Sequence, residues 1–228
     1  MNTNSYPNVT TLGNQVETNR VLRNTYALLA LSMVPTILGA WIGVSTGILN
    51  TMSPMVSMLV FFVGAFGLMF AVERTKNSST GVFVLLGFTF FMGLMLSRLI
   101  GHVLHMKGGS EIVMLAFAST AVIFFGMATL SSVIKRDLSG MGKFLMIGAV
   151  LVMVAGIANV FLQSSAMMIT ISVAVAGIFS AFIVHDLKAV RAGLETNYIS
   201  ATLNVYLDIY NVFQALLSIL GIFGSRDE

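Results

Sequence analysis

Two aspartates are the residues of this chain best placed to do chemistry, because both stand in apolar surroundings. Asp208 lies within Ala201–Phe223, a run that is otherwise apolar and long enough to cross a bilayer. A carboxylate at the centre of a membrane helix costs roughly 2.5–3.5 kcal/mol on insertion scales, and it usually faces a bundle interior or a water-filled cavity. Asp186 stands at the end of the preceding apolar segment, in the sequence VHDLKAVRAG. Two acids on successive membrane helices predict a functional site.

The chemistry that these acids could share depends on how close they come. We expect Asp208 to lie about 10 Å along its helix, at 1.5 Å per residue. If the preceding helix continues a turn beyond Val184, its Asp186 carboxyl group can meet that of Asp208. Two close acids in a low-dielectric region cannot both ionise easily, and they titrate as a coupled pair. The pair is therefore predicted to act as a proton-sensitive latch, and it is a candidate ligand pair for a hard cation such as Ca²⁺. For Asp186 alone, the alternative is an interfacial acid paired with Lys188 or Arg191.

The composition of the chain indicates a membrane protein. Of its 228 residues, 57% are hydrophobic and only 9% are charged, and the mean hydropathy is +0.92. A soluble domain has about 25% charged residues. The 12 Lys and Arg residues are too few to cover a globular surface, so the net positive charge does not indicate nucleic acid. The chain has no cysteine, which excludes disulfides, thiolate metal sites and a cysteine nucleophile.

Seven apolar segments approach the roughly 20 residues that a helix needs to cross the bilayer. They are approximately Asn24–Ile48, Pro54–Val72, Gly81–Leu104, Ile112–Ile134, Phe144–Phe161, Ala166–Val184 and Ala201–Phe223. Backbone groups in lipid must be satisfied internally, so segments of this length predict helices rather than strands. We therefore expect an all-α integral membrane protein with seven transmembrane helices in one domain, residues 24–224. A polar N-terminal tail of residues 1–23, mobile over residues 1–19, and a short C-terminal tail of residues 225–228 flank it.

The basic residues predict the orientation of the chain. With the N-terminus inside and seven crossings, nine basic residues lie inside and three lie outside or in the outer half, as the positive-inside rule requires. The inner set is Arg20, Arg23, Arg74, Lys76, Lys135, Arg136, Lys143, Lys188 and Arg191, and the outer set is Arg98, Lys107 and Arg226. The C-terminus is then predicted on the side opposite the N-terminus. A re-entrant last segment is the alternative, because that segment is the most polar of the seven.

A polar stripe runs along the last apolar segment. Asn204, Asp208, Asn211 and Ser218 follow the spacing of one helix face. Such a stripe cannot comfortably face lipid, which predicts that the last helix is central in the bundle. The functional interpretation is an ion or proton pathway formed by Asp186, Asp208, Asn204 and Asn211. The alternative is a hydrogen-bonded lock between helices.

Other residues are weaker candidates for a site. Arg74 ends the second segment and could reach the acid pair and hold it ionised, although an ordinary interfacial charge pair with Glu73 is an alternative. Arg98, His102 and His105 fall on one face near the end of the third segment. Two imidazoles without a nearby carboxylate are weak evidence for a metal site, so interfacial solvation is the favoured interpretation.

Three glycines of the first segment indicate close helix packing. Gly39, Gly43 and Gly47 repeat at four-residue spacing. Small residues at this spacing let helix backbones approach closely. We favour packing within the bundle over a dimer interface.

An enzymatic function has little support in the sequence. The chain has no HExxH, no GxSxG and no glycine-rich phosphate loop. Two carboxylates sharing a proton could serve an intramembrane aspartyl hydrolase, but the segments lack the GxGD sequence of such proteases. We therefore predict that the protein is not an enzyme and keep the intramembrane hydrolase as a minor alternative.

The chain resembles the Bax inhibitor-1 family, also called the transmembrane Bax inhibitor motif family, and in particular its bacterial YccA-like branch. The matching stretches are Val21–Tyr26 (VLRNTY), Glu195–Ile199 (ETNYI) and Leu207–Gly221 (LDIYNVFQALLSILG). The seven-segment layout matches along nearly the whole chain after the tail. The resemblance implies a multi-pass protein of the bacterial inner membrane whose last helix is enclosed by six others, with a periplasmic C-terminus in the predicted orientation.

The resemblance implies two functions. Some members are pH-sensitive calcium leak channels whose sensor is an aspartate pair on the last two helices, and Asp186 and Asp208 match that pair by position. We therefore predict a calcium leak gated by this pair, with no cofactor other than Ca²⁺ as the transported ion. The YccA-like branch instead implies a substrate and modulator of the membrane protease FtsH, bound through a cytoplasmic tail that residues 1–19 match by position and composition. Lipid is the expected surrounding of either, and nucleic acid is not an expected partner.

Overall fold

The chain folds into seven long α-helices and one short 3-10 helix. The computed structural model describes residues 9–136, 138 and 140–224, with side chains described from Val16 onward. The helices are α1 (Val9–Thr46), η1 (Ile48–Thr51), α2 (Pro54–Thr75), α3 (Ser79–Leu104), α4 (Gly109–Val133), α5 (Met141–Leu162), α6 (Ser165–Arg191) and α7 (Tyr198–Gly224). All seven α-helices are long and apolar enough to cross a membrane. This confirms the predicted all-α membrane fold.

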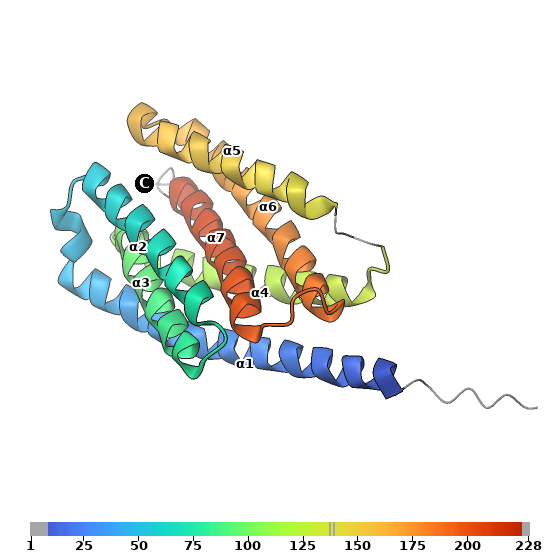
Figure 1. The fold of residues 1–228 in the computed structure, drawn as a ribbon. Helices are drawn as coiled ribbons and strands as arrows, with labels where there is room; N and C mark the ends of the chain where they lie inside the picture. Colours follow the sequence, from blue (N-terminus) through green and yellow to red (C-terminus); the bar gives the residue numbers. More distant parts are fainter. Residues whose placement is uncertain (1–8, 137, 139, 225–228) are drawn as a thin grey trace, which may run out of the picture.

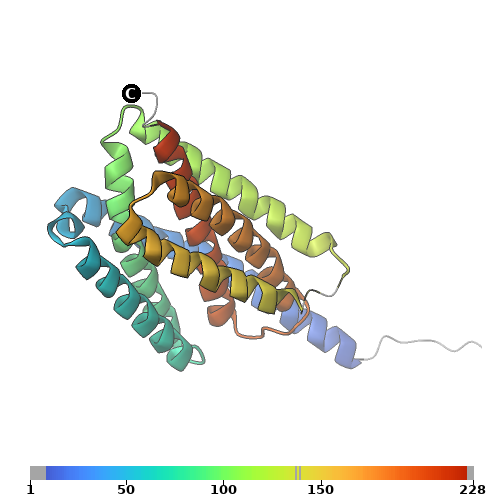
Figure 2. The same ribbon diagram turned by 90° about the horizontal axis from the view of Figure 1, so that it is seen from above.

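Helix α7 lies in the middle of the bundle (Figures 1 and 2). It packs against α1, α2, α3, α4 and α6, whereas α5 packs against α6 on the outside. The last helix is therefore central, as predicted. We call the end of the bundle at which α1, α3, α5 and α7 finish the distal end, and the opposite end the proximal end. Helix α7 is one unbroken helix between the two ends, and it is long and apolar enough to cross a membrane.

The surface of the bundle is apolar, as expected for helices surrounded by lipid. Large side chains such as Phe125, Phe144 and Val122 are at least two-thirds exposed. The buried core lies instead around α3 and α7, where the rings of Phe88 and Tyr206 meet edge to face. Large apolar side chains are thus found both on the surface and in the core of the bundle.

Helices α1 and α3 cross at very short distance because glycines line the contact. A Cβ atom on Gly39 would lie 2.1 Å from a backbone oxygen of α3, and one on Gly93 would lie 2.0 Å from the backbone oxygen of Thr36. Gly43 also faces α3, and Gly47 ends α1 with a φ of 62°. The glycine repeat of α1 therefore serves packing within the bundle, as predicted.

Tyr206 of α7 ties this crossing to the central helix. Its hydroxyl lies 2.9 Å from Thr36 Oγ1 of α1, and it lies 3.3 Å from the backbone oxygen of Thr89 in α3. A buried tyrosine hydroxyl needs such partners, because an unpaired polar group in the membrane interior is costly. The contact fixes α7 against α1 and α3.

The start of α7 is fixed by Asn197. Its Oδ1 accepts hydrogen bonds from the backbone N–H groups of Ile199 (2.9 Å) and Ser200 (3.2 Å), so it caps the helix. Its Nδ2 donates to the backbone oxygen of Lys76 (3.1 Å) and to Asn77 Oδ1 (2.9 Å). Asn197 therefore also fastens α7 to the turn between α2 and α3.

Two helix boundaries differ from the predictions. Helix α6 continues to Arg191 rather than ending at Val184, because the intervening residues are helix formers and the first helix-ending residue is Gly193, with a φ of 72°. Helix α1 begins at Val9, so part of the expected mobile tail is helical. Extending a formed helix adds one hydrogen bond for each residue ordered, which favours such an extension. The first eight residues of the predicted tail and the predicted C-terminal tail lie outside the described residues.

Candidate functional site: the aspartates of α6 and α7

Asp208 is a buried acid in the middle of the central helix. Its side chain belongs to the core of α7, and the residue is only 4% exposed. Within the part of the chain that the structure describes, its Oδ2 atom is buried without a hydrogen-bond partner. Buried polar atoms are nearly always paired, so an orphaned carboxyl oxygen needs an explanation. A negative charge at this position would destabilise the protein unless a proton or a cation neutralised it or water solvated it.

Asp186 lies within α6, and its carboxyl group has a polar partner. The Nδ1 atom of His185 donates a hydrogen bond of 2.7 Å to Asp186 Oδ1, and the Asp186 side chain is 18% exposed. The imidazole is held in turn, because it meets the ring of Phe182 edge to face and faces Gly142 of α5. The sequence analysis missed His185, although its position directly before Asp186 was a visible signal.

Helix α6 extends past Asp186, so this acid lies within a helix that packs against the helix of Asp208. The two acids have unlike surroundings, because Asp186 has the hydrogen bond from His185 whereas Asp208 has a buried oxygen without a partner among the described residues.

The neighbouring cations of α6 make other contacts. Lys188 donates to a backbone carbonyl that follows α4. Arg191 donates to the hydroxyls of Ser131 (3.3 Å) and Tyr26 (3.4 Å), on α4 and α1. Across residues 16–136 and 140–224, the pairing of Asp186 with Lys188 or Arg191 is not formed. Both cations instead hold α6 to its neighbours.

Arg74 has an aromatic contact within its own helix. Its guanidinium lies 5.2 Å from the centre of the Phe70 ring. The adjacent Glu73 accepts hydrogen bonds from Lys76 (2.6 Å) and from the hydroxyl of Ser200 (2.9 Å). It is therefore Glu73 rather than Arg74 that links the end of α2 to the start of the central helix.

The polar stripe of α7 lies along a flank that is only partly covered. Asn204 and Gln214 are exposed, Asn211 and Ser218 are half-buried, and Asp208 is buried. The amide of Asn211 donates to a backbone carbonyl of its own helix at 2.7 Å. The stripe thus has one buried acid at its edge, and it does not form an enclosed path through the bundle.

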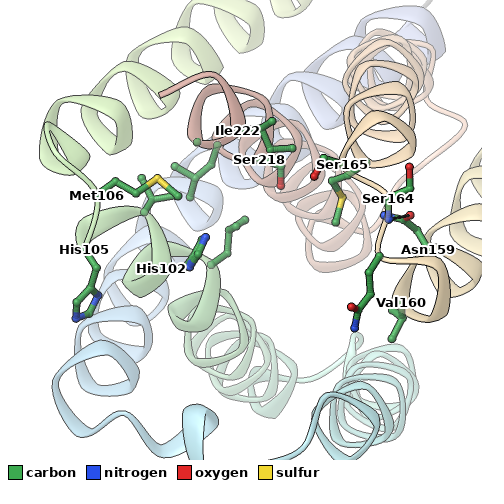
Figure 3. Close-up of a pocket in the computed structure, with 15 residues that line it drawn as sticks. His102, His105, Met106, Asn159, Val160, Ser164, Ser165, Ser218 and Ile222 are labelled. Carbon is green, nitrogen blue, oxygen red and sulfur yellow. Dashed lines mark hydrogen bonds between the residues drawn. The ribbon is translucent and has the colours of Figure 1, made fainter. Parts of the chain in front are cut away.

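A cavity of about 700 Å³ opens at the distal end of this stripe, between α3, α7 and the α5–α6 connection. Ser218 and Ser165 point into it, as does His102, whereas His105 points away (Figure 3). Ser218 lies about 15 Å beyond Asp208 along the helix axis at 1.5 Å per residue. The two histidines therefore do not converge as a metal site would require. Among the described residues, no group of three or more His, Asp or Glu side chains could hold a metal.

Known proteins resemble this chain along nearly its whole length. Residues 18–225 match the family model described as "Inhibitor of apoptosis-promoting Bax1". The chain is 37% identical over 228 residues to an uncharacterized membrane protein of Vibrio cholerae, with both chains covered in full. It is 36% identical over 212 residues to the "Modulator of FtsH protease YccA" of Escherichia coli K12, covering 93% of this chain and 94% of the relative. The same values apply to the "Inner membrane protein YccA" of Escherichia coli O6:H1.

Proposed function

We propose, from the premise that this chain belongs to the Bax inhibitor-1 family, that it passes cations across the membrane under the control of Asp186 and Asp208. The seven apolar helices and the inner-membrane relatives support a multi-pass protein of the inner membrane. The observation that carries the proposal is the buried, unpartnered Oδ2 of Asp208. Ca²⁺ is the proposed ion, because it prefers oxygen ligands and binds carboxylates well.

The proposed pH sensitivity arises from competition at Asp208. A proton and a cation each relieve the cost of a buried charge, and both use the same carboxyl oxygens. Asp186, on the helix packed against α7, would add a second negative charge, which would strengthen the attraction for a divalent ion. Lys188 and Arg191 are engaged elsewhere, so they leave this attraction in place. Protonation therefore excludes the cation, and loss of the proton admits it.

The proposed route follows the polar stripe. An ion would enter or leave through the distal cavity beside Ser218 and pass the amide of Asn211 before reaching Asp208. Asp186 would receive it toward the proximal end of α6. Because polar residues line the partly covered flank of α7, this flank is the part of the bundle that would admit water while an ion passes.

Flux through purified protein tests this proposal. Proteoliposomes containing a Ca²⁺ indicator should show uptake above that of empty liposomes, and the rate should vary over a pH range of about 5 to 8, because protonation of the carboxyl group would exclude the cation. Glu111→Gln is the matched control, since it removes an exposed acid at the distal end. Its flux should equal that of the wild type. Equal rates in wild-type and empty liposomes at every pH would contradict the leak.

A second function is favoured by one specific observation, the 36% identity to the FtsH modulator YccA across both chains. We propose that this chain also binds a membrane protease of this kind through the residues that precede its first span at Val16. The names of the matched family and of this relative describe an inhibitor and a modulator, which favours a non-enzymatic role. We therefore do not propose the intramembrane hydrolase.

The decay of the protein in cells tests the second function. Deleting residues 2–15 removes no part of the predicted spans. In cells containing the protease, the truncated protein should be longer-lived than the full chain, whereas both should decay equally without the protease. Equal decay of the two forms in both strains, measured by pulse-chase labelling, would remove this function for the chain while leaving the leak untouched.

A further inference from the structure

Arg98 is a charged residue inside a membrane helix, and it has no acidic partner among the described residues. It lies about 9 Å before the end of α3 at 1.5 Å per residue. Its Nη1 donates to Ser57 Oγ of α2 at 3.1 Å. The ion pairs that the described residues form do not include Arg98. A guanidinium has five N–H donors, so one hydroxyl satisfies only a small part of it. An intramembrane cation without a counter-ion points to a bound anion.

The space beside Arg98 can hold such an anion. A second cavity at the distal end has a volume of about 560 Å³, and Arg98, Asn50, His102 and His105 line it together with Met95, Leu99 and Gly101. Among the residues that the structure describes, no carboxylate belongs to this lining. The Asn50 amide and the His102 ring supply further N–H donors. His105 is already occupied in part, because its Nδ1 lies 2.6 Å from the backbone oxygen of Gly101.

The position of the cavity indicates where the anion comes from. Asn50 belongs to η1, which also carries Ile48 at 47% exposure, and the end of α1 just before it carries Trp41 at 66% exposure. Exposed tryptophan near a helix end is typical of the membrane interface, where lipid phosphates lie. Arginine binds phosphate with two parallel hydrogen bonds, which makes it the preferred residue for this group.

We propose that Arg98, with Asn50 and His102, forms a binding site for a phosphate group at the distal end of the bundle. The phosphate would belong to a phospholipid headgroup whose chains lie against the apolar end of α1, or it would be free phosphate. The site is separate from the aspartates of α6 and α7 and does not depend on the proposed leak.

Native mass spectrometry of the detergent-purified protein tests this site. The three probes are phosphatidylglycerol, diacylglycerol with the same acyl chains, and inorganic phosphate. The wild type should bind phosphatidylglycerol, and it should bind diacylglycerol at least about tenfold more weakly, as expected when a charge-assisted hydrogen bond is lost. Binding of inorganic phosphate that also requires Arg98 would identify free phosphate as a ligand. Binding of the phospholipid alone would identify the lipid headgroup.

The variants separate the site from general attraction of lipid to positive charge. Arg98→Gln should weaken phosphatidylglycerol binding at least about tenfold, and Arg98→Lys should weaken it less, because a lysine keeps the charge but loses the bidentate geometry. Lys107→Gln is the matched control, since it removes a cation at the same end that does not line the cavity. The affinity of Lys107→Gln for phosphatidylglycerol should stay within about twofold of that of the wild type.

A further variant keeps the proposal testable if Arg98→Gln does not fold. Asn50→Asp changes an exposed residue of η1 and places a carboxylate in the lining of the cavity. Repulsion of the phosphate should then weaken phosphatidylglycerol binding by at least about tenfold. Wild-type affinity in Asn50→Asp or Arg98→Gln, or equal binding of diacylglycerol and phosphatidylglycerol, would overturn the proposal.

Discussion

His185 donates a 2.7 Å hydrogen bond to Asp186, so one acid of the pair has a polar partner while the other has none. Asp208 has a buried oxygen without a hydrogen bond in the described part of the chain. The two carboxyl groups are therefore not equivalent. The charge of Asp208 must be neutralised by a proton or cation, or solvated by water, that enters the site. The carboxyl group of Asp186 is already oriented by the hydrogen bond from His185.

Loss of the His185 imidazole should therefore destabilise the end of α6. His185→Leu removes the hydrogen-bond donor to the Asp186 carboxyl oxygen. We expect the free energy of unfolding to fall by about 1–2 kcal/mol. His185→Gln can still donate and should recover most of this loss. Thermal unfolding in detergent, followed by circular dichroism, measures both variants. Identical melting temperatures of His185→Leu and wild type would show that the hydrogen bond does not contribute to stability.

Asn197→Ala should destabilise the protein by about 1–2 kcal/mol or more, because it removes both the helix cap and the hydrogen bonds to the α2–α3 turn. Asn204→Ala is the matched control, since Asn204 is an exposed asparagine of the same helix. The same thermal measurement compares them. If the two variants melted alike, the capping role of Asn197 would be wrong.

The crossing of α1 and α3 predicts opposite outcomes for two glycines of one helix. Gly93→Ala places a Cβ against the backbone of Thr36 and should destabilise by about 1–3 kcal/mol, because the helices must move apart. Gly87→Ala meets nothing within 4 Å and should stabilise by about 0.5–1 kcal/mol through helix propensity. The melting temperatures of the two variants test this prediction. A Gly93→Ala protein that melted at the wild-type temperature would contradict the close crossing.

The ion pair at the end of α2 should stabilise the protein at neutral pH and lose this effect at strongly alkaline pH. The hydrogen bond to Glu73 raises the pKa of Lys76 above its ordinary value of 10.5. A group whose pKa is raised by folding stabilises the protein fully below its unfolded value, and this contribution is lost as the pH rises through the folded value. At neutral pH, Lys76→Gln should lower the free energy of unfolding by at most about 1 kcal/mol, because the pair is exposed. Above the folded pKa of Lys76, the substitution should have no effect on stability. A cost that stays constant from neutral to strongly alkaline pH would refute this assignment.

Most of the fold could be predicted from the sequence because the bilayer imposes it. Spans of apolar residues dictate helices, and the predicted start or end of α2, α3 and α4 lies within a few residues of the observed one. The end of α6 was harder, because hydropathy falls at His185 although the helix continues. Hydropathy reports the environment of a segment, whereas helix termination depends on Gly193 and its backbone conformation.

The site was predictable in part. Asp208 and Asp186 stood out because acids are rare in such segments. The hydrogen bond from His185, the capping by Asn197 and the engagement of Arg191 with Tyr26 depend on which side chains meet across helices. Asn204 shows the same limit, because helical spacing places it on the stripe with Asp208 but cannot show that this flank is open.

The pH profile of Ca²⁺ flux through Asp208→Asn proteoliposomes tests the central claim most directly. The substitution keeps the size of the side chain and removes the group that takes up the proton. We predict that wild-type flux varies with pH, whereas in Asp208→Asn the ratio of rates at pH about 5 and about 8 falls to that of empty liposomes. Reconstitution at equal protein-to-lipid ratio, with Glu111→Gln as control, makes the rates comparable. An Asp208→Asn protein that kept the wild-type pH dependence would contradict the account.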